Sequence, residues 1–269
     1  MLEAVPKEIE DTVGAVAARA EEEGGDAVAA HRPVGGGRWV PESWAALGRL
    51  RREVAAGLIA RGVARGDRVA LVSQTRWEWG PIDLGILSVG AVTVGIYPTS
   101  TPEQVGYILQ HSRARLVFVD NDAQRARLSA VLEGLDVVVI EGGLDVFRAS
   151  GDVGAVEARG AQVRASDLAT LVYTSGTTGP PKAVALSHRN LLATSKVGTR
   201  FLGAQRGDVA VSYLPMAHVL TRVNYYGYLQ VRGVAFIAES LEKVSEAWVE
   251  AKPMMVSAVP RVLEKVQAR

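Results

Sequence analysis

The chain alternates short apolar, β-rich runs with segments of helical periodicity, and this alternation restricts the fold more than any other feature of the sequence. Strands that alternate with helices favour parallel sheets that are covered by helices on both faces. We therefore expect an α/β fold of layered, largely parallel β-sheets. The apolar runs that we expect to form strands are residues 69–73, 91–97, 115–119, 136–140, 169–174, 183–186, 209–213, 234–238 and 254–258.

Two polar residues mark predicted helix starts. Ser43 precedes leucine and valine residues spaced by three and four positions, and Gly62 ends that pattern. Thr101 begins Thr-Pro-Glu-Gln, a capping box with proline at the first helical position. Residues 84–97 carry no charge and are too short to span a bilayer, which needs about 20 residues. We expect the end of a buried helix there, followed by a buried strand.

The charge balance excludes several classes of function. The 269 residues contain 30 Lys and Arg against 29 Asp and Glu, so the net charge is +1 and a general nucleic-acid binder is not expected. For the same reason we expect the arginines at 49, 51 and 52 to lie on a solvated helix face rather than in a basic patch. The absence of cysteine excludes disulfides and thiolate sites. With no apolar run at the start, a cytoplasmic protein is expected; a peripheral membrane contact stays open.

A change of composition suggests an internal boundary. Residues 141–166 contain five glycines among small and charged residues, with little periodicity. They form either a linker or a loop with a short helix. We expect an N-terminal α/β subdomain over residues 1–166, including this Gly-rich connection, and the start of a second α/β subdomain over residues 167–269.

One segment between two apolar runs has the composition of a phosphate-binding loop. It reads Leu-Val-Tyr-Thr-Ser-Gly-Thr-Thr-Gly-Pro-Pro-Lys over residues 171–182. Glycines permit close approach of the backbone to a ligand, successive N–H groups can bind anions, and hydroxyl and ammonium groups suit phosphate oxygens. It is not a Walker A loop, because proline and alanine flank the lysine. The predicted phosphate-binding residues are Thr174, Ser175, Gly176, Thr177, Thr178, Gly179 and Lys182.

This loop closely resembles the signature loop of the adenylate-forming (AMP-dependent synthetase/ligase) superfamily. Residues 187–191, which resemble the start of the following helix with Ser187 as N-cap, and residues 208–220 match further motifs. Residues 66–70, 97–102 and 238–265 resemble the long-chain fatty acyl-CoA synthetases in particular. Ala183 departs from the usual glycine, and residues 219–222 depart from the long-chain pattern, which puts the chain-length preference in doubt.

The resemblance implies a reaction and its participants. A fatty acid carboxylate attacks the α-phosphate of ATP, pyrophosphate leaves, and the thiol of CoA then attacks the acyl-adenylate. Lys182 and the loop hydroxyls would hold the β- and γ-phosphates, and Thr174 would give one oxygen ligand to Mg²⁺. His218 would lie beside the acyl group and the α-phosphate, so that Lys182 and His218 are the expected catalytic residues. A homodimer stays open.

The resemblance covers only the N-terminal part of the family fold. The adenine-binding motif, the carboxylate ligand of Mg²⁺ and the C-terminal domain with its catalytic lysine are expected beyond residue 269. We therefore expect an N-terminal fragment that is inactive alone. The alternatives are another carboxylate-activating enzyme, with a shorter or aromatic acid, and a truncated, non-catalytic nucleotide- or acyl-binding module. Tyr225, Tyr226 and Tyr228 are expected mainly to pack in the core, with part of an acyl tunnel beside them.

Overall fold

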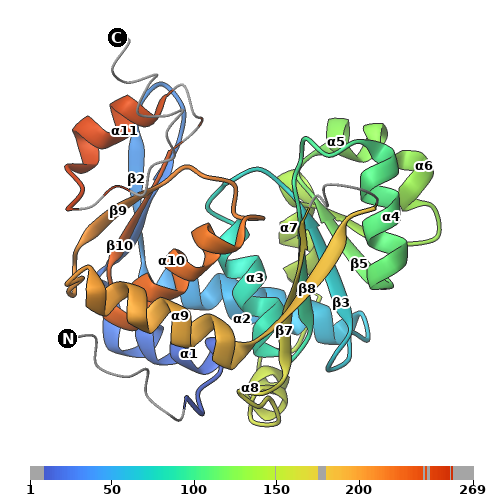
Figure 1. Ribbon diagram of the computed structural model, residues 1–269, viewed down its shortest axis with the longest axis horizontal. Helices are drawn as coiled ribbons and strands as arrows, with labels where there is room; N and C mark the ends of the chain where they lie inside the picture. Colours follow the sequence, from blue (N-terminus) through green and yellow to red (C-terminus); the bar gives the residue numbers. More distant parts are fainter. Residues whose placement is uncertain are drawn as a thin grey trace.

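The computed structural model describes residues 9–148, 150–174, 180–238, 240, 243–254 and 256. Two β-sheets stand on either side of a layer of helices, and further helices cover the outer faces of both sheets (Figure 1). The expected α/β architecture with layered, largely parallel sheets is confirmed.

The larger sheet has six strands in the order β6-β5-β3-β4-β7-β8. All neighbours are parallel except β7 and β8, which form an antiparallel pair at one edge. Every residue of β4 is buried, because helices cover both faces of this inner strand. The strands are β3 (Arg68–Val72), β4 (Val92–Ile96), β5 (Ala114–Val119), β6 (Asp136–Val139), β7 (Leu168–Thr174) and β8 (Lys182–Ser187).

The smaller sheet combines two strands from the N-terminal part of the chain with two from the C-terminal part. Its order is β2-β1-β10-β9, with β1 parallel to β10 through the pair Ala30 and Ala235. The strands are β1 (Val28–Pro33), β2 (Trp39–Ser43), β9 (Val209–Ser212) and β10 (Val234–Ile237). Each sheet therefore combines strands from both sides of residue 166. The division into subdomains 1–166 and 167–269 stays a prediction.

Five helices form the layer between the sheets, and their buried side chains share one core with the inner faces of both sheets (Figure 1). Trp79 and Tyr226, both fully buried, lie in this core. Helix α3 is buried on all sides, whereas the other helices present one side to this core. The five are α1 (Val13–Gly24), α2 (Trp44–Ala60), α3 (Trp79–Ser88), α9 (His188–Phe201) and α10 (Val219–Val231).

The remaining helices lie at the outer faces or link strands. Helices α4 (Pro102–Ser112), α5 (Asp122–Arg127) and α6 (Ser129–Leu132) cover the outer face of the larger sheet, and α11 (Val244–Ala251) covers that of the smaller sheet (Figure 1). The Gly-rich connection forms two short helices, α7 (Ile140–Arg148) and α8 (Gly154–Gly160).

The predicted helix starts are confirmed by their caps. The Ser43 hydroxyl accepts from the backbone N–H of Ala46 at 3.1 Å, and both Thr101 and Ser187 complete capping boxes. The expected helix and strand over residues 84–97 are the end of α3 and β4. Most of the expected strand over residues 254–258 lies outside the described residues.

The expectation of a solvated position was wrong for Arg51. Its side chain is 6% exposed and faces α1 and α3. Its guanidinium donates to the Glu21 carboxylate at 2.6 and 2.8 Å and to the Ser88 hydroxyl at 2.9 Å. A buried carboxylate from another helix compensates the charge, and this partner cannot be identified from the periodicity of α2 alone. Arg49 is exposed, as expected.

Candidate functional site

The ends of β7 and β8 bring together the two described residues of the predicted phosphate loop. Thr174 is the last residue of β7 and Lys182 is the first of β8, and the two pair across the antiparallel ladder. Both side chains are exposed. A hydroxyl and an ammonium group therefore stand side by side at the carboxyl end of a strand, where open α/β sheets bind ligands. The predicted partners Ser175, Gly176, Thr177, Thr178 and Gly179 lie outside the described residues.

A second loop, residues 213–218, lies near the carboxyl ends of the inner strands β3 and β4. Thr75, just after β3, fixes this loop through two hydrogen bonds. The Thr75 hydroxyl donates to the carbonyl of Leu214 at 2.8 Å and accepts from the N–H of Met216 at 3.2 Å. Gly95 of β4 lies so close to Ala217 that a Cβ atom on Gly95 would be 3.1 Å from the Cα of Ala217. Because β4 pairs with β7, this loop lies against the strand next to the one that ends at Thr174.

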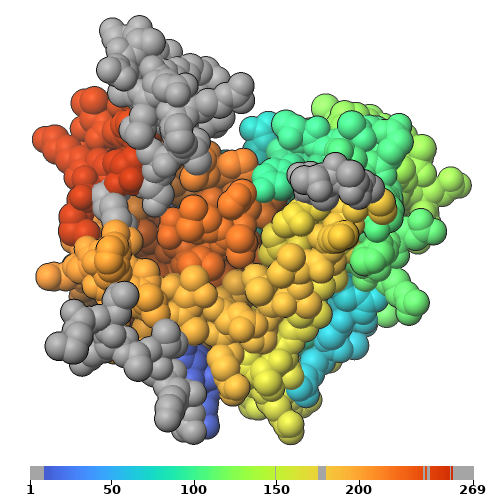
Figure 2. All heavy atoms as spheres, viewed as in Figure 1, coloured from blue at the N-terminus to red at the C-terminus, as the bar shows by residue number. Residues whose placement is uncertain are grey.

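His218 ends this loop and caps α10. Its Nδ1 accepts a hydrogen bond from the backbone N–H of Leu220 at 3.2 Å. The neutral ring must then carry its proton on Nε2, because a neutral imidazole has one donor and one acceptor nitrogen. The side chain is exposed. His218 thus offers an N–H donor in a loop that packs on β4, the strand next to the one that ends at Thr174. In Figure 2 the surface is hollowed between the orange segment around α10 and the green segment that follows β4.

A buried polar network ties α10 to α3 and to the strand that precedes the phosphate loop. Arg222 donates to the Asp83 carboxylate at 2.7 Å and to the Thr170 hydroxyl at 2.5 Å, and the Tyr226 hydroxyl donates to Asp83 at 2.6 Å. The side chains of Arg222 and Asp83 are 1% and 0% exposed. Burial raises the pKa of Tyr226, so its hydroxyl stays protonated and remains a donor.

Sequence reasoning missed this network, although one signal was present. Asp83 is a single charge inside the apolar helix α3, and such a residue needs a buried partner. The partner could not be chosen from the sequence, because Arg222 is far along the chain and one of many arginines. The guanidinium of Arg222 also lies over the ring of Trp79, 5.6 Å from its centroid.

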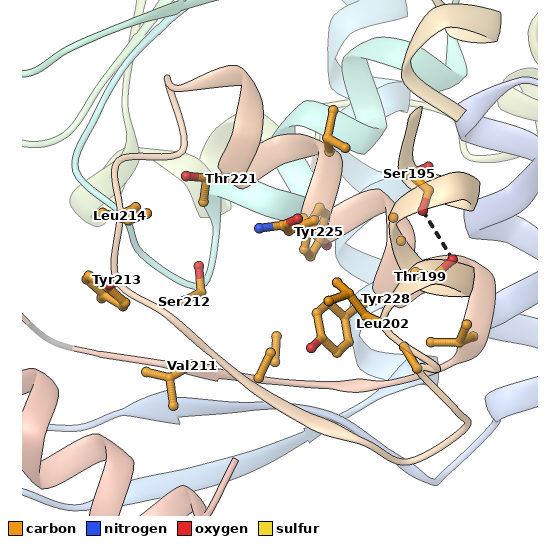
Figure 3. A pocket seen from close by; sticks show the side chains of 18 residues that line it. Ser195, Thr199, Leu202, Val211, Ser212, Tyr213, Leu214, Thr221, Tyr225 and Tyr228 are labelled. Carbon is orange, nitrogen blue, oxygen red and sulfur yellow. Dashed lines mark hydrogen bonds between the residues drawn. The ribbon is translucent and has the colours of Figure 1, made fainter. Parts of the chain in front are cut away.

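An apolar cavity opens behind α10 on the side of the smaller sheet (Figure 3). This first cavity lies between α9, α10, β9 and β10 and has a volume of about 70 Å³. Thr221, Tyr225 and Tyr228 line it at helical spacing, so one face of α10 forms its wall. Tyr226 packs in the core as expected, whereas Tyr225 and Tyr228 border the cavity.

The residues at the sheet edge fit a phosphate-bound Mg²⁺ ion better than a metal held by protein alone. Among the described residues, no group of three or more His, Asp and Glu side chains could hold an ion. Mg²⁺ commonly takes only one or two protein ligands together with phosphate oxygens and waters. The exposed hydroxyl of Thr174, beside Lys182, can supply one such oxygen.

Residues 16–269 match the family of AMP-binding enzymes, and the chain belongs to this family. The resemblance to adenylate-forming enzymes, closest to the long-chain fatty acyl-CoA synthetases, is thereby confirmed. The long-chain-fatty-acid–CoA ligase FadD15 of Mycobacterium bovis is 36% identical over 269 residues, which cover 95% of this chain and 45% of the relative. The peroxisomal long chain acyl-CoA synthetase 6 of Arabidopsis thaliana is 30% identical over 261 residues, or 87% of this chain and 36% of the relative. The chain thus spans less than half the length of these relatives.

Solved structures share the fold. The N-terminal domain of FACL13 from Mycobacterium tuberculosis superposes with a TM-score of 0.83 at 23% identity, covering 96% of this chain and 65% of that one. ATP-bound MatB from Rhodopseudomonas palustris gives a TM-score of 0.83 at 23% identity, covering 96% and 52%. No helix in the described part of the chain is long and apolar enough to cross a membrane.

Proposed function

We propose that the complete protein is an AMP-forming long-chain fatty acid–CoA ligase. It would use ATP to convert a fatty acid into an acyl-adenylate and pyrophosphate, and then transfer the acyl group to CoA with release of AMP. The observation that carries this proposal is the arrangement of three features. Thr174 and Lys182 pair at the carboxyl end of β7, the loop that ends at His218 packs on the neighbouring strand β4, and an apolar cavity is lined by α10, the helix that His218 caps.

Lys182 and the loop hydroxyls would bind the β- and γ-phosphates of ATP. Phosphoryl-transfer chemistry depends mainly on positioning and on stabilisation of charge, so a lysine and several neutral donors suffice for the protein's part. Mg²⁺, when bound, would neutralise phosphate charge, with the Thr174 hydroxyl as one of its ligands. Lys182 is anchored through the backbone pairing of β7 and β8, which fixes its place relative to Thr174.

His218 would orient the reacting carboxylate. With Nδ1 occupied by the Leu220 N–H, the Nε2–H can donate to an oxygen of the carboxylate or of the α-phosphate. A donor fixed in this way stabilises charge that develops in the transition state without reorganising. The capping bond thus sets both the tautomer and the direction of the ring.

The first cavity would hold the hydrocarbon chain of the acid. It begins beside Thr221, in the first turn of α10 and next to His218, and extends along the helix to Val231. Ten residues of α-helix rise by about 15 Å, which suits an extended aliphatic chain better than a compact one. Transfer of the chain from water would contribute about 25 cal/mol per Å² of apolar surface buried.

The proposal is tested by pyrophosphate release from the complete protein with palmitate, octanoate or benzoate as the acid. Palmitate should support the highest kcat/KM, and EDTA should abolish release until MgCl₂ is restored. A preference for octanoate or benzoate would favour the other carboxylate-activating enzymes. The 269-residue chain by itself should form no acyl-CoA, and turnover by the purified chain would contradict that expectation.

A further inference from the structure

A second, smaller cavity of about 30 Å³ lies beside the first, against the adjoining flank of α10. Its walls come from the smaller sheet, α2, α3 and the segment around Trp77, with Trp44, Leu47 and Met216 among the apolar side chains. Four residues line both cavities and therefore separate them: Ser212, Tyr225, Tyr228 and Ala235. The two tyrosines are by far the largest of these.

Close backbone contacts fix the rings of both tyrosines. A Cβ atom on Gly80 would lie 2.5 Å from the hydroxyl oxygen of Tyr225, and one on Gly233 would lie 2.2 Å from Cδ1 of Tyr228. The rings thus occupy space that is open only because these two neighbours are glycines. Figure 3 shows the ring of Tyr228 projecting from α10 into the space beside β9.

Hydrogen bonding by the hydroxyl groups does not explain why residues 225 and 228 are tyrosines. Both hydroxyl oxygens are buried and have no hydrogen-bond partner among the residues that the structure describes. A buried hydroxyl without a partner lowers stability, so a residue kept only for packing would be better served by phenylalanine. What both side chains do supply is bulk at the boundary between two apolar spaces.

We propose that Tyr225 and Tyr228 form a wall between the two cavities and thereby restrict the substrate to an unbranched acyl chain. This inference rests on the proposed function, because it takes the first cavity as the acyl site. An extended chain would run along α10 without crossing the wall. A methyl branch needs space to the side of the chain, and on the α2 and α3 side the rings fill that space.

The test compares palmitate with phytanate, a saturated acid that carries methyl branches, in the complete protein. Two quantities are measured for each acid: affinity, by displacement of a fluorescent fatty acid, and kcat/KM in pyrophosphate release. Tyr228→Ala should raise the phytanate-to-palmitate ratio at least tenfold, since the fit of a single methylene in an apolar pocket can change discrimination by that factor. Tyr228→Phe should leave the ratio near its wild-type value, because the ring remains.

Tyr107→Ala is the matched control. Tyr107 stacks on His111 in α4, on the outer face of the larger sheet, so the same truncation there should not change the ratio. Thermal unfolding of each preparation shows whether Tyr228→Ala folds. If it does not, Tyr228→Leu, which keeps an apolar side chain against Gly233, replaces it.

The proposed wall would be contradicted by an unchanged phytanate-to-palmitate ratio in the folded Ala or Leu variant. An equal loss of affinity and of kcat/KM for both acids would contradict it too. Failure of the wild-type protein to release pyrophosphate with either acid would instead count against the proposed function. The binding ratio still tests the wall in that case, because displacement requires no turnover.

Discussion

Gly95 in β4 packs directly on the backbone of Ala217, the residue before His218. A Cβ atom at position 95 would be 3.1 Å from the Cα of Ala217, closer than most side-chain contacts allow. The inner strand of the larger sheet therefore fixes the position of the loop that presents His218. The absence of a side chain at one buried position determines where a candidate catalytic group lies.

Gly95→Ala should impair turnover more than folding. The added methyl group must displace the 213–218 loop by a few tenths of an ångström, and overpacking of this kind costs about 1–3 kcal/mol of stability. Misplacing a reacting group by about 1 Å can lower the rate about 10²-fold, so we expect kcat to fall several-fold. Urea unfolding and pyrophosphate release on one preparation check both effects. Gly143→Ala, where a Cβ would meet only Val139 at 3.6 Å, is the control, and equal kcat in both variants would contradict the prediction.

Asp83→Asn should destabilise the complete protein strongly. It leaves the guanidinium of Arg222 buried without a compensating charge, and breaking a buried pair in this way costs about 3–5 kcal/mol. Urea unfolding measures the loss. Asp11→Asn provides the comparison, because the Asp11–Arg19 pair is half exposed and such pairs contribute at most about 1 kcal/mol. Similar losses at the two positions would show that Asp83 is not needed to compensate Arg222.

Lys182→Ala should weaken the use of ATP without affecting folding. Removal of one charge-assisted contact costs about 1.5–3 kcal/mol. This corresponds to roughly 10- to 150-fold in kcat/KM for ATP if the contact persists in the transition state. Steady-state kinetics with varied ATP give the value, and Lys196→Ala on α9 should leave it unchanged. A normal kcat/KM in the Lys182 variant would mean that the loop is structural only.

His218→Asn separates the two roles of this residue. The amide oxygen of asparagine can replace Nδ1 as the helix cap, so stability should stay close to that of the wild type. The Nε2–H is lost, and removal of such a donor costs about 10²–10³ in kcat. His218→Ala should lose both the cap, about 1 kcal/mol, and the rate. If the Asn variant turned over normally, the histidine would be a cap and nothing more.

Stability should fall as the pH is lowered from 6.5 towards 4, because His188 is fully buried. Its Nδ1 accepts from the N–H of Val13 at 3.2 Å, and burial lowers its pKa to about 4. Between these pH values the unfolded chain binds the proton more readily, so stability is lost at up to about 1.4 kcal/mol per pH unit. His188→Asn keeps an acceptor but cannot titrate. Urea unfolding across this range should show a shallower slope for the variant, and identical slopes would refute the assignment.

Features that depend on neighbouring residues could be predicted from the sequence. The caps at Ser43 and Thr101 and the buried strands follow from local hydrogen bonding and from runs of apolar side chains. Features that depend on distant partners could not. Nothing in the sequence distinguishes Arg51 and Arg222 from arginines on the surface. Only the tertiary structure brings a buried carboxylate to each of them.

The candidate site divides in the same way. The phosphate loop is recognisable because its chemistry is contiguous in sequence, as is the motif that carries His218. A tunnel beside the tyrosines of α10 was expected from the resemblance, but its division into two cavities was not predictable, because they form where α10 fails to fill the space against the smaller sheet. The smaller sheet itself was only half predicted: β1 contains His31, Arg32 and Pro33 and does not have the apolar pattern of an inner strand.

The parallel pairing of β1 with β10 has a consequence for the order of folding. Ala30 can pair with Ala235 only after the whole of the chain between them has been made, and this large sequence separation gives the sheet a high contact order. During synthesis β1 and β2 would form an antiparallel pair without β10, while the strands of the larger sheet assemble first. Hydrogen-exchange labelling during refolding should therefore protect the amides of β3 and β5 before those of β1. The cavity walls would then be among the last parts of the molecule to form.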